Sequence, residues 1–395
     1  MATPDRPFGR ALSRPAQIVV AIPDLRLVLG RLEALGVRAQ SAEKNEDLGL
    51  ALVELASEGV KSWAVARRDT QEADDDKVLD ALFDDLYTYF DHEFGHWVPT
   101  IGKNRSVDEV GGEHTIGVGD EGEPAEAGQL DARSAEAGAG VAVGVADTVL
   151  HRNEWLDGAY QVPWAGLWRD GVTVPRATVP EYQTGHATFV LGMILQKAPG
   201  AHAVVRQVLG NDGFADSWDV ARALVRFERL GIDILNLSLG CFTGDNQPPL
   251  VLQTALNRLD PDIVVVAAAG NHARAAEKQR RPLWPAALPR AVAVGATDAE
   301  RNVPEWSPEP KNWPWVNVLA TGKDVTSTFI NGRVELPKGS KDFKGFATWS
   351  GTSFAAAKVS GAVAAGTVPG RASAATALRE LMARHRGDDG IPWIP

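Results

Sequence analysis

The residues best suited to chemistry in this sequence lie at positions 351–361, which read GTSFAAAKVSG. Gly351 permits a tight turn, Thr352 and Ser353 are residue types that begin helices, and the residues that follow are rich in Ala. Ser353 is therefore predicted at a helix N-terminus, where free N–H groups and the helix dipole would stabilise an oxyanion beside its hydroxyl. Taken alone, these residues also suit an ordinary serine cap on a buried helix, so partners elsewhere must decide.

Three polar residues end or follow other predicted elements. Asp147 ends the apolar run VAVGVAD, His186 opens the apolar helical pattern HATFVLGMIL, and Asn271 follows VVVAAAG. Each has an ordinary reading by itself, as a strand-ending acid, a packing histidine or a turn-forming amide. Because the carboxyl ends of parallel strands meet at one edge of an open α/β sheet, we expect the three to gather there with Ser353.

These four residue types supply what a serine nucleophile requires. His186 can serve as the base, Asp147 can orient that base, and an amide such as that of Asn271 can donate to an oxyanion. The chain order is acid, histidine, serine, whereas α/β-hydrolases run serine, acid, histidine. The sequence around Ser353 also lacks the G-x-S-x-G pattern of those enzymes.

The elements that would position these residues can be read from the hydrophobic pattern. Apolar runs alternate with helical patterns beyond residue 140, which predicts an α/β fold with a doubly wound, mostly parallel sheet. The first hundred residues suggest a small α/β module with a strand, an amphipathic helix, a further strand or buried segment and a second helix. The apolar runs cover 141–147, 203–209, 233–239, 262–268, 291–295 and 316–320, and the elements of the module cover 17–22, 24–35, 48–55 and 74–94.

The four motifs, in this order, resemble those of the subtilisin-like serine proteases, or subtilases, over residues 138–385. VAVGVADT resembles the Asp motif of that family, GHATFVLG the His motif, AAAGN the oxyanion Asn segment and GTSFAAAKVSG the Ser motif. The resemblance implies a serine endopeptidase acting on a peptide or protein substrate through Asp147, His186 and Ser353, with Asn271 in the oxyanion hole.

The resemblance also implies where a substrate would bind. It places the peptide along Ser238, Leu239 and Gly240, with Gly270 beside it. It places Leu283 and Trp284 near the pocket for the residue before the cut, and makes the Trp284–Pro285 bond a candidate cis peptide. This sequence departs from the family at positions that shape the cleft rather than at the four catalytic ones: Val149, Phe189, Ala357 and Lys358.

The predicted division of the chain is a module at 1–105, an acidic Gly-rich linker at 106–137 and a subtilisin-like catalytic domain at 138–395. By position and size the module resembles the prodomain of many subtilases. We expect self-cleavage between residues 106 and 140, because a tethered substrate has a high local concentration. The alternative is a flexible spacer that keeps the module permanently attached.

Two rival functions are open at this point. A catalytically silent subtilase fold could act as a peptide-binding module. HEFGH at residues 92–96 matches the HExxH zinc-protease pattern, in which His92 and His96 would be ligands and Glu93 the base. Gly95 weakens that helix, and a third ligand such as Glu113 or His114 would have to come from the linker.

Composition limits the partners and the setting. The formal net charge of -11 argues against nucleic-acid and anionic-membrane partners, because both require a basic surface. The absence of an apolar run long enough for a signal peptide or a membrane span predicts a cytoplasmic protein, as does the single cysteine, Cys241, which we expect to be buried. No cofactor is expected, and structural calcium is left open because no EF-hand spacing occurs.

Overall fold

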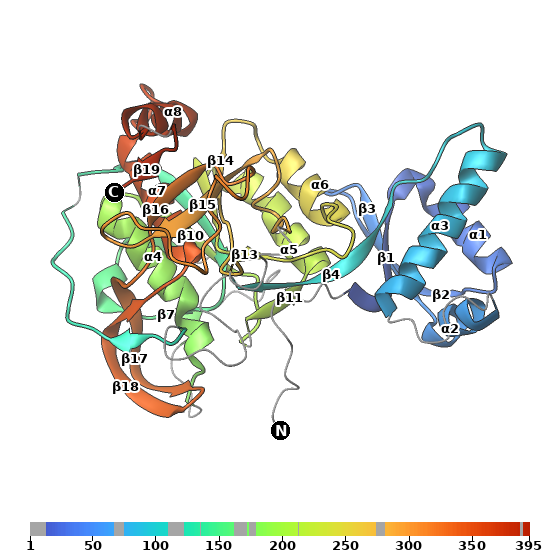
Figure 1. Cartoon of the computed structure of the whole chain (residues 1–395), viewed down its shortest axis with the longest axis horizontal. Helices are drawn as coiled ribbons and strands as arrows, with labels where there is room; N and C mark the ends of the chain where they lie inside the picture. Colours follow the sequence, from blue (N-terminus) through green and yellow to red (C-terminus); the bar gives the residue numbers. More distant parts are fainter. Residues whose placement is uncertain are drawn as a thin grey trace.

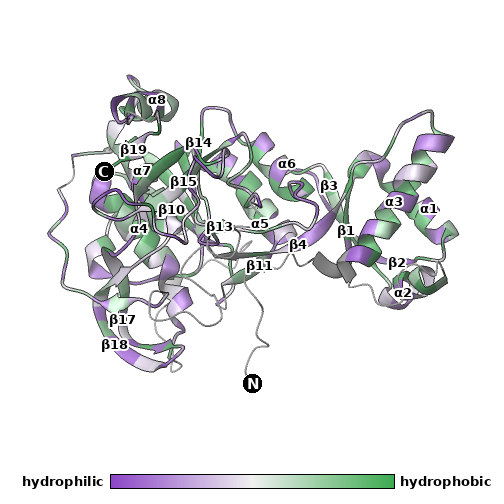
Figure 2. Cartoon of the chain, in the orientation of Figure 1, coloured by the Kyte–Doolittle hydropathy of each residue, from purple (hydrophilic) through white to green (hydrophobic). Residues whose placement is uncertain are grey.

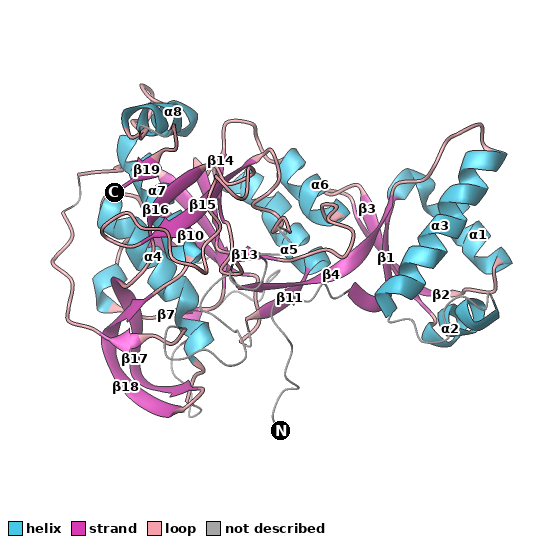
Figure 3. Cartoon of the chain, in the orientation of Figure 1, coloured by secondary structure: helices cyan, strands magenta, loops and turns pink. Residues whose placement is uncertain are grey.

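The structure, a computed structural model, forms a small N-terminal α/β module and a larger α/β domain connected by one long strand (Figures 1 and 3). Among the residues described, no helix is long and apolar enough to cross a membrane. The described residues are 13–66, 75–109, 122–134, 136–161, 172–173, 179–211, 213–273, 281–387 and 390–395.

A sheet of eight parallel strands is the centre of the larger domain. Its order is β19-β16-β15-β14-β12-β6-β10-β8. Each predicted apolar run contributes a strand, and the predicted mostly parallel sheet is confirmed. The strands are β6 (Ala142–Asp147), β8 (Tyr160–Gln161), β10 (His202–Gln207), β12 (Ile234–Leu237), β14 (Val264–Ala268), β15 (Ala291–Thr297), β16 (Val318–Thr321) and β19 (Trp393–Ile394).

Helices cover both faces of this sheet, which explains its continuous apolar sequence. Along β14, Val264 and Val266 belong to the buried cluster that contains α4, α7 and α8, whereas Val265 belongs to the cluster that contains α5 and α6. Figure 2 shows β14 and β15 in the hydrophobic colour. The helices are α4 (His186–Lys197), α5 (Ser217–Leu224), α6 (Leu250–Arg258), α7 (Thr352–Gly366) and α8 (Ala374–Arg384).

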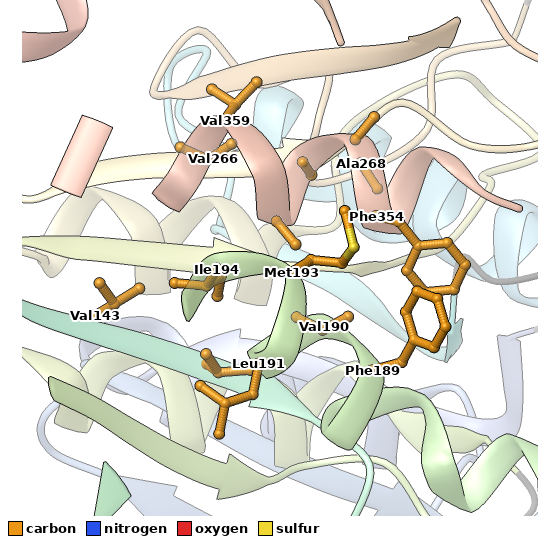
Figure 4. Packing of buried hydrophobic residues seen from close by; sticks show 14 of the residues in the cluster. Val143, Phe189, Val190, Leu191, Met193, Ile194, Val266, Ala268, Phe354 and Val359 are labelled. Carbon is orange, nitrogen blue, oxygen red and sulfur yellow. The ribbon is translucent and has the colours of Figure 1, made fainter. Parts of the chain in front are cut away.

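Helices α4 and α7 pack directly against each other, and this contact brings two of the predicted catalytic segments together. A Cβ built on Gly361 would lie 2.5 Å from the carbonyl oxygen of Ile194, so only glycine permits this approach of α7 to α4. The rings of Phe189 in α4 and Phe354 in α7 contact each other near the N-terminal ends of the two helices (Figure 4), with their centroids 4.3 Å apart and their planes tilted by 45°. Because both helices begin at this end, their first residues lie near one another.

The N-terminal module has the α/β character predicted for it. Leu79, Leu82, Leu86 and Phe90, the apolar positions predicted on one helical face, are all buried in the core of the module. Its sheet is antiparallel where β1 pairs with β3, β3 with β2 and β1 with β4. The elements are β1 (Ser13–Ala21), α1 (Leu25–Ala34), β2 (Ala39–Asn45), β3 (Leu50–Leu55), α2 (Ser57–Ala66), α3 (Asp75–Glu93) and β4 (Ile101–Glu109).

Strand β4 differs from the expectation of a loop beginning at residue 106. It pairs with β1 in the module and then continues beside β11 (Phe214–Asp216) and β13 (Leu239–Gly240) of the larger domain. The first four residues assigned to the linker are therefore strand, held by pairing with distant segments rather than by their own composition. Residues 110–121 of the linker lie outside the described part of the chain.

A long hairpin leads into the serine segment. β17 (Val325–Leu336) pairs antiparallel with β18 (Gly339–Trp349), and β18 also pairs with β5 (Ala125–Glu126), a second strand within the predicted linker. The remaining described strands, β7 (Leu150–His151) and β9 (Val172–Thr173), pair parallel to each other. Since β18 ends at Trp349, the hairpin leads directly to Gly351 and to the start of α7 at Thr352.

Candidate active site

Ser353 lies in the first turn of α7, as predicted, and its side chain is completely buried. Its carbonyl oxygen accepts a hydrogen bond from Ser238 Oγ at 3.1 Å. The side chain of Asn236 connects Ser238 to α7 a second time. Its Nδ2 donates to Ser238 Oγ at 3.0 Å, and its Oδ1 accepts from Ser360 Oγ at 2.9 Å. This buried and satisfied network fixes the start of α7 relative to β12 and the residues that follow it.

His186 and Asp147 form a short contact at the edge of the sheet. Asp147 is the last residue of β6, His186 is the first of α4, and Asp147 Oδ1 lies 2.7 Å from His186 Nδ1. Neither side chain is exposed to solvent. A carboxylate only accepts hydrogen bonds, so Nδ1 carries the proton and Nε2 is left as the basic nitrogen of the neutral imidazole.

Thr148 holds the end of β6 against the start of α4, a role that its own sequence did not predict. Its hydroxyl accepts from Ala187 N at 3.1 Å and donates to Thr184 O at 3.3 Å, and its own N–H donates to Asp147 Oδ1 at 2.7 Å. The Thr148 side chain thus satisfies one of the free N–H groups at the start of α4. This arrangement positions His186 opposite the end of β6.

Aromatic rings enclose the imidazole on the side of α7. The ring of His186 lies 5.6 Å from that of Phe354, the residue after Ser353, and 5.8 Å from that of Trp349 at an interplanar angle of 90°. The imidazole therefore lies beside the start of the serine helix. The apolar rings restrict its rotation and keep water from that side, which strengthens its interaction with Asp147.

Asn271 follows β14, and Thr352 fixes the orientation of its amide. Asn271 Oδ1 accepts hydrogen bonds from the backbone N–H and the hydroxyl of Thr352, both at 3.0 Å. The same hydroxyl accepts from Gly270 N at 3.0 Å. Because both donors hold Oδ1, the Nδ2 donor faces away from Thr352, and it lies 3.5 Å from the position of a Cβ built on Gly351.

The predicted substrate-binding residues line the ends of β13 and β14. Leu239 and Gly240 form β13, Ser238 precedes it, and all three are buried. Leu283 lies behind Gly240 and Gly270, with its Cγ 2.8 Å from the position of a Cβ built on Gly240. Trp284 exchanges backbone hydrogen bonds with Cys241, which is buried as expected. The Trp284–Pro285 bond is cis, as the resemblance implied.

The chain itself pairs with this edge. Glu109 of β4 lies opposite Leu239, and Asp108 lies opposite Gly240 on one side and Phe214 on the other. All of these pairings are antiparallel, so β4 lies between β11 and β13 as the central strand of three. The edge that was expected to receive a peptide substrate is thus occupied by the last residues of β4.

Two buried histidines flank the site. Burial, opposed by a backbone hydrogen bond with Thr184, lowers the pKa of His151 to about 4. Burial likewise lowers the pKa of His272 to about 4. The Thr184 hydroxyl gives its proton to Glu181 O, so His151 Nε2, 3.0 Å away, must be the donor to that hydroxyl. Both rings are neutral at physiological pH.

The HEFGH segment does not form the geometry of a zinc helix. Helix α3 ends at Glu93, and Gly95 and His96 have φ of +63° and +70°, so His92 and His96 do not share a helical face. His92 contacts Glu93, and His96 contacts Asp91, at 3.2 Å each. Within the described parts of the chain, no group of three or more His, Cys, Asp or Glu residues could hold a metal ion. Glu113 and His114 lie outside those parts.

Comparison with known proteins adds a second line of evidence. The sequence model of the subtilase family matches residues 138–383. The chain is 30% identical over 189 residues to "Thermophilic serine proteinase" of Bacillus sp. (strain AK1) and 28% identical over 190 residues to "Major intracellular serine protease" of Bacillus subtilis (strain 168). These matches cover 48% and 46% of this chain, but only 40% and 54% of the two relatives.

A solved structure supports the fold independently. The protease domain of PatA, solved as a point mutant, aligns with a TM-score of 0.51 and 22% identity, covering 66% of this chain and 94% of that domain. At this identity the likeness concerns the fold alone. The family match, however, extends over more than half of the chain and contains all four motifs. The chain therefore belongs to the subtilase family.

Proposed function

We propose that this chain is a serine endopeptidase that hydrolyses peptide bonds in peptides or proteins. The observation that carries the proposal is the buried contact of 2.7 Å between His186 Nδ1 and Asp147 Oδ1, beside the start of the helix that begins with Thr352 and Ser353. A histidine held in this tautomer beside a helix-starting serine is suited to remove the serine proton.

In the proposed mechanism, Ser353 Oγ attacks the carbonyl carbon of the peptide bond while His186 Nε2 takes the hydroxyl proton. Asp147 keeps the imidazole in the required tautomer and stabilises the imidazolium that forms. The Nδ2 group of Asn271 and the backbone N–H of Ser353 donate to the oxyanion of the tetrahedral intermediate. His186 then protonates the leaving amine, and water hydrolyses the acyl-enzyme with the same base.

Hydrolysis of an unstructured protein such as casein by purified wild-type, Ser353→Ala and His186→Ala chains tests this mechanism. We expect both variants to lose hydrolysis while keeping the wild-type melting temperature, because the groups act as one unit. Activity within tenfold of wild type in either variant would refute the assignment. A catalytically silent peptide-binding fold, the alternative, predicts that even the wild type cleaves nothing.

We further propose that the N-terminal module inhibits the protease and is removed by self-cleavage. The support is β4, which occupies the substrate edge between β11 and β13. The module is also held by contacts outside the cleft: Asn104 Oδ1 accepts from Trp218 N at the start of α5 at 3.0 Å, and Asp47 pairs with Arg229 at 2.6 Å. These contacts would hold β4 in the cleft until the module is removed.

Intact-mass spectrometry of wild type and Ser353→Ala during prolonged incubation tests the self-cleavage. We expect the wild type to separate into two fragments cut between residues 106 and 140, and the variant to stay whole. If the wild type stays whole while it cleaves added protein, the module is a permanent part of the enzyme rather than a removable inhibitor.

An intracellular, cytoplasmic setting is part of the proposal. It is supported by the relative named as a major intracellular serine protease and by the presence of one buried cysteine, which suits a reducing compartment. Fractionation of source cells followed by immunoblotting would test it, and recovery in the culture medium would contradict it. We also propose that catalysis requires no cofactor, since the triad and the oxyanion donors suffice chemically.

A further inference from the structure

A pocket outside the active site opens on the N-terminal module. It has a volume of about 530 Å³ and is lined by residues of α2 and α3 and by Arg31 of α1. Two of the lining residues, Ala64 of α2 and Ala81 of α3, have small side chains that leave space between the helices. The volume suits a ligand of side-chain or short-peptide size, since such sites measure roughly 300–1,000 Å³.

The sheet of the module separates this pocket from the active-site cleft. Val20 of β1 belongs to the hydrophobic cluster of α1, α2 and α3, which cover one face of that sheet. The neighbouring Val19 belongs to the cluster of α5 and α6 in the larger domain, on the other face. Figure 1 shows the three helices at the end of the molecule beyond the sheet. A ligand in the pocket would therefore not compete with a peptide in the cleft.

The pocket carries an excess of negative charge. Among the described residues that line it, Asp84, Asp85 and Glu93 supply carboxylates. The lining contains one guanidinium, that of Arg31, whose Nη2 pairs with Asp85 Oδ2 at 2.9 Å. Asp84 and Glu93 are exposed, so their charges remain at the mouth of the pocket. These two carboxylates favour a cationic ligand.

Arg31 shows how a guanidinium is held at this site. Its Cζ lies 4.0 Å from the centroid of the Tyr89 ring, while its Nη2 pairs with the carboxylate of Asp85. Rings and carboxylates are the partners that a guanidinium prefers, because it stacks on the first and donates hydrogen bonds to the second. The same lining contains a second ring, Trp63, and the exposed carboxylate of Asp84. The pocket thus offers a second basic side chain the kinds of partner that Arg31 has.

An exposed apolar patch adjoins the pocket at the end of α3. Phe94 of the HEFGH segment is 45% exposed, Trp97 is 37% exposed and Val98 is 42% exposed. The Phe94 ring contacts that of Trp97 and that of Tyr89, which also lines the pocket, at centroid distances of 6.0 and 6.5 Å. A metal ion or a free amine would leave this patch in water, whereas a peptide segment would cover the pocket and the patch together.

Charge also distinguishes a protein from a membrane as the partner of this patch. Exposed aromatic side chains can enter a lipid surface, but anionic lipid attracts basic segments and repels acidic ones. Helix α3 contains seven Asp and Glu residues and one Lys. A basic polypeptide segment matches both the charge of the pocket and the apolar character of the patch.

We propose that the pocket and the patch form a docking site for a segment of another protein that carries an arginine or lysine close to an apolar residue. The charged end of the basic side chain lies beside Asp84 and Glu93, where it forms ion pairs. Its methylene groups pack against Trp63 and Tyr89, and the apolar residue covers Phe94. The proposal goes beyond the protease function and does not depend on it.

Calorimetric titration of the full-length Ser353→Ala chain tests the proposal without cleavage of the ligand. The probe is an acetylated and amidated peptide, Gly-Ser-Phe-Ser-Arg-Ser-Gly, in which Phe and Arg lie on the same side of an extended backbone. Its control contains citrulline, which has nearly the shape of arginine without the charge. The arginine peptide should bind about five- to thirtyfold more tightly, because two partly exposed ion pairs contribute about this factor.

Changes in the pocket locate the effect. In a chain that also carries Asp84→Asn and Glu93→Gln, the two peptides should bind equally, and the melting temperature should stay the same because both positions are exposed. Glu58→Gln is the matched control, since it removes a charge from α2 outside the pocket lining and should keep the ratio. If the double variant does not fold, loss of the ratio in about 0.5 M NaCl provides the second measurement.

Four results would overturn the proposal. The first is equal binding of the two peptides to the Ser353→Ala chain, or no binding at about 1 mM. The second is an equal loss of the ratio in Glu58→Gln, which would indicate a general effect of charge. The third is self-association that the double variant abolishes, and the fourth is binding to phosphatidylserine vesicles without binding of peptide. Because the titrated chain lacks the nucleophile, none of these results bears on the proposed proteolysis.

Discussion

Replacing Thr352 by Val is expected to slow catalysis without weakening substrate binding. Thr352 is completely buried, and its hydroxyl is one of two donors that hold Asn271 Oδ1, the other being its own backbone N–H. Valine has nearly the same shape but cannot donate. The variant would keep the backbone donor and lose the hydroxyl, so the Asn271 amide would be held by one hydrogen bond instead of two.

The size of the effect follows from the number of bonds lost. One net hydrogen bond is worth about 0.5–1.5 kcal/mol, so a loss of orientation of this size corresponds to a fall in kcat of about 2- to 13-fold. The hydroxyl also accepts from Gly270 N at 3.0 Å, and a buried N–H left without an acceptor costs about 1–3 kcal/mol. We therefore expect a reduced free energy of unfolding as well.

Steady-state kinetics on one peptide and urea denaturation measure the two effects separately. Thr352→Ser is the matched control, because it keeps the hydroxyl and removes only a methyl group; its kcat should stay within about twofold of wild type. If Thr352→Val raised only KM, or if the Ser and Val variants lost the same kcat, the role of Thr352 in orienting the Asn271 amide would be refuted.

Three further perturbations have defined outcomes. Asn271→Ala should lower kcat by about 10²–10³, the loss known for the matching donor of a subtilisin, and a change confined to KM would assign Asn271 to binding. Melting temperature should fall as pH drops from about 6.5 toward 4, because His151 and His272 have folded pKa values of about 4 and the unfolded chain takes up protons first. Between pH 6.5 and pH 4, each histidine should lower the free energy of unfolding by up to about 3 kcal/mol. His151→Gln should therefore flatten the fall of melting temperature with pH, and an unchanged slope of melting temperature against pH would contradict this. Chelation by EDTA, or the pair His92→Ala and His96→Ala, should leave peptide turnover intact, and loss of turnover at unchanged melting temperature would favour a zinc enzyme.

Much of the larger domain could be predicted because local pattern and global fold agree there. Continuous β-branched runs such as VVVAA form buried parallel strands, and the chemistry lies where those strands end. Ser353 and His186 lie in the first turns of their helices because the local sequence favours a helix start there. Their position at the same edge of the sheet could be predicted from the parallel topology. The buried thiol of Cys241 also agreed with prediction.

Strand β4 could not be predicted from its own residues. Its sequence IGKNRSVDE is mostly polar, yet Lys103, Asn104 and Arg105 are each at most 5% exposed. Lys103 pairs with Asp80 at 2.7 Å, and Asn104 accepts hydrogen bonds from Ser217 and from the start of α5. These partners are far away in sequence, so tertiary contacts override the weak strand propensity.

The orienting roles of Thr148 and Thr352 were not predicted, for a related reason. Thr148 and Thr352 each stand next to a predicted catalytic residue, and that adjacency was the only available signal. Their roles depend on partners contributed by other elements, Ala187 in one case and Asn271 in the other. A hydroxyl beside a catalytic residue can cap, orient or simply pack, and only the fold decides between these.

The identity of the nucleophile is the central claim, and mass spectrometric mapping of a fluorophosphonate adduct tests it most directly. The wild-type chain should carry one adduct, on Ser353, and His186→Ala should carry none under the same conditions, because the serine is reactive only when His186 accepts its proton. Thr352→Ser, which retains Ser353, His186 and the orienting hydroxyl, is the control and should be labelled. An adduct on another residue, or equal labelling of Ser353 in the His186→Ala chain, would contradict the proposed triad.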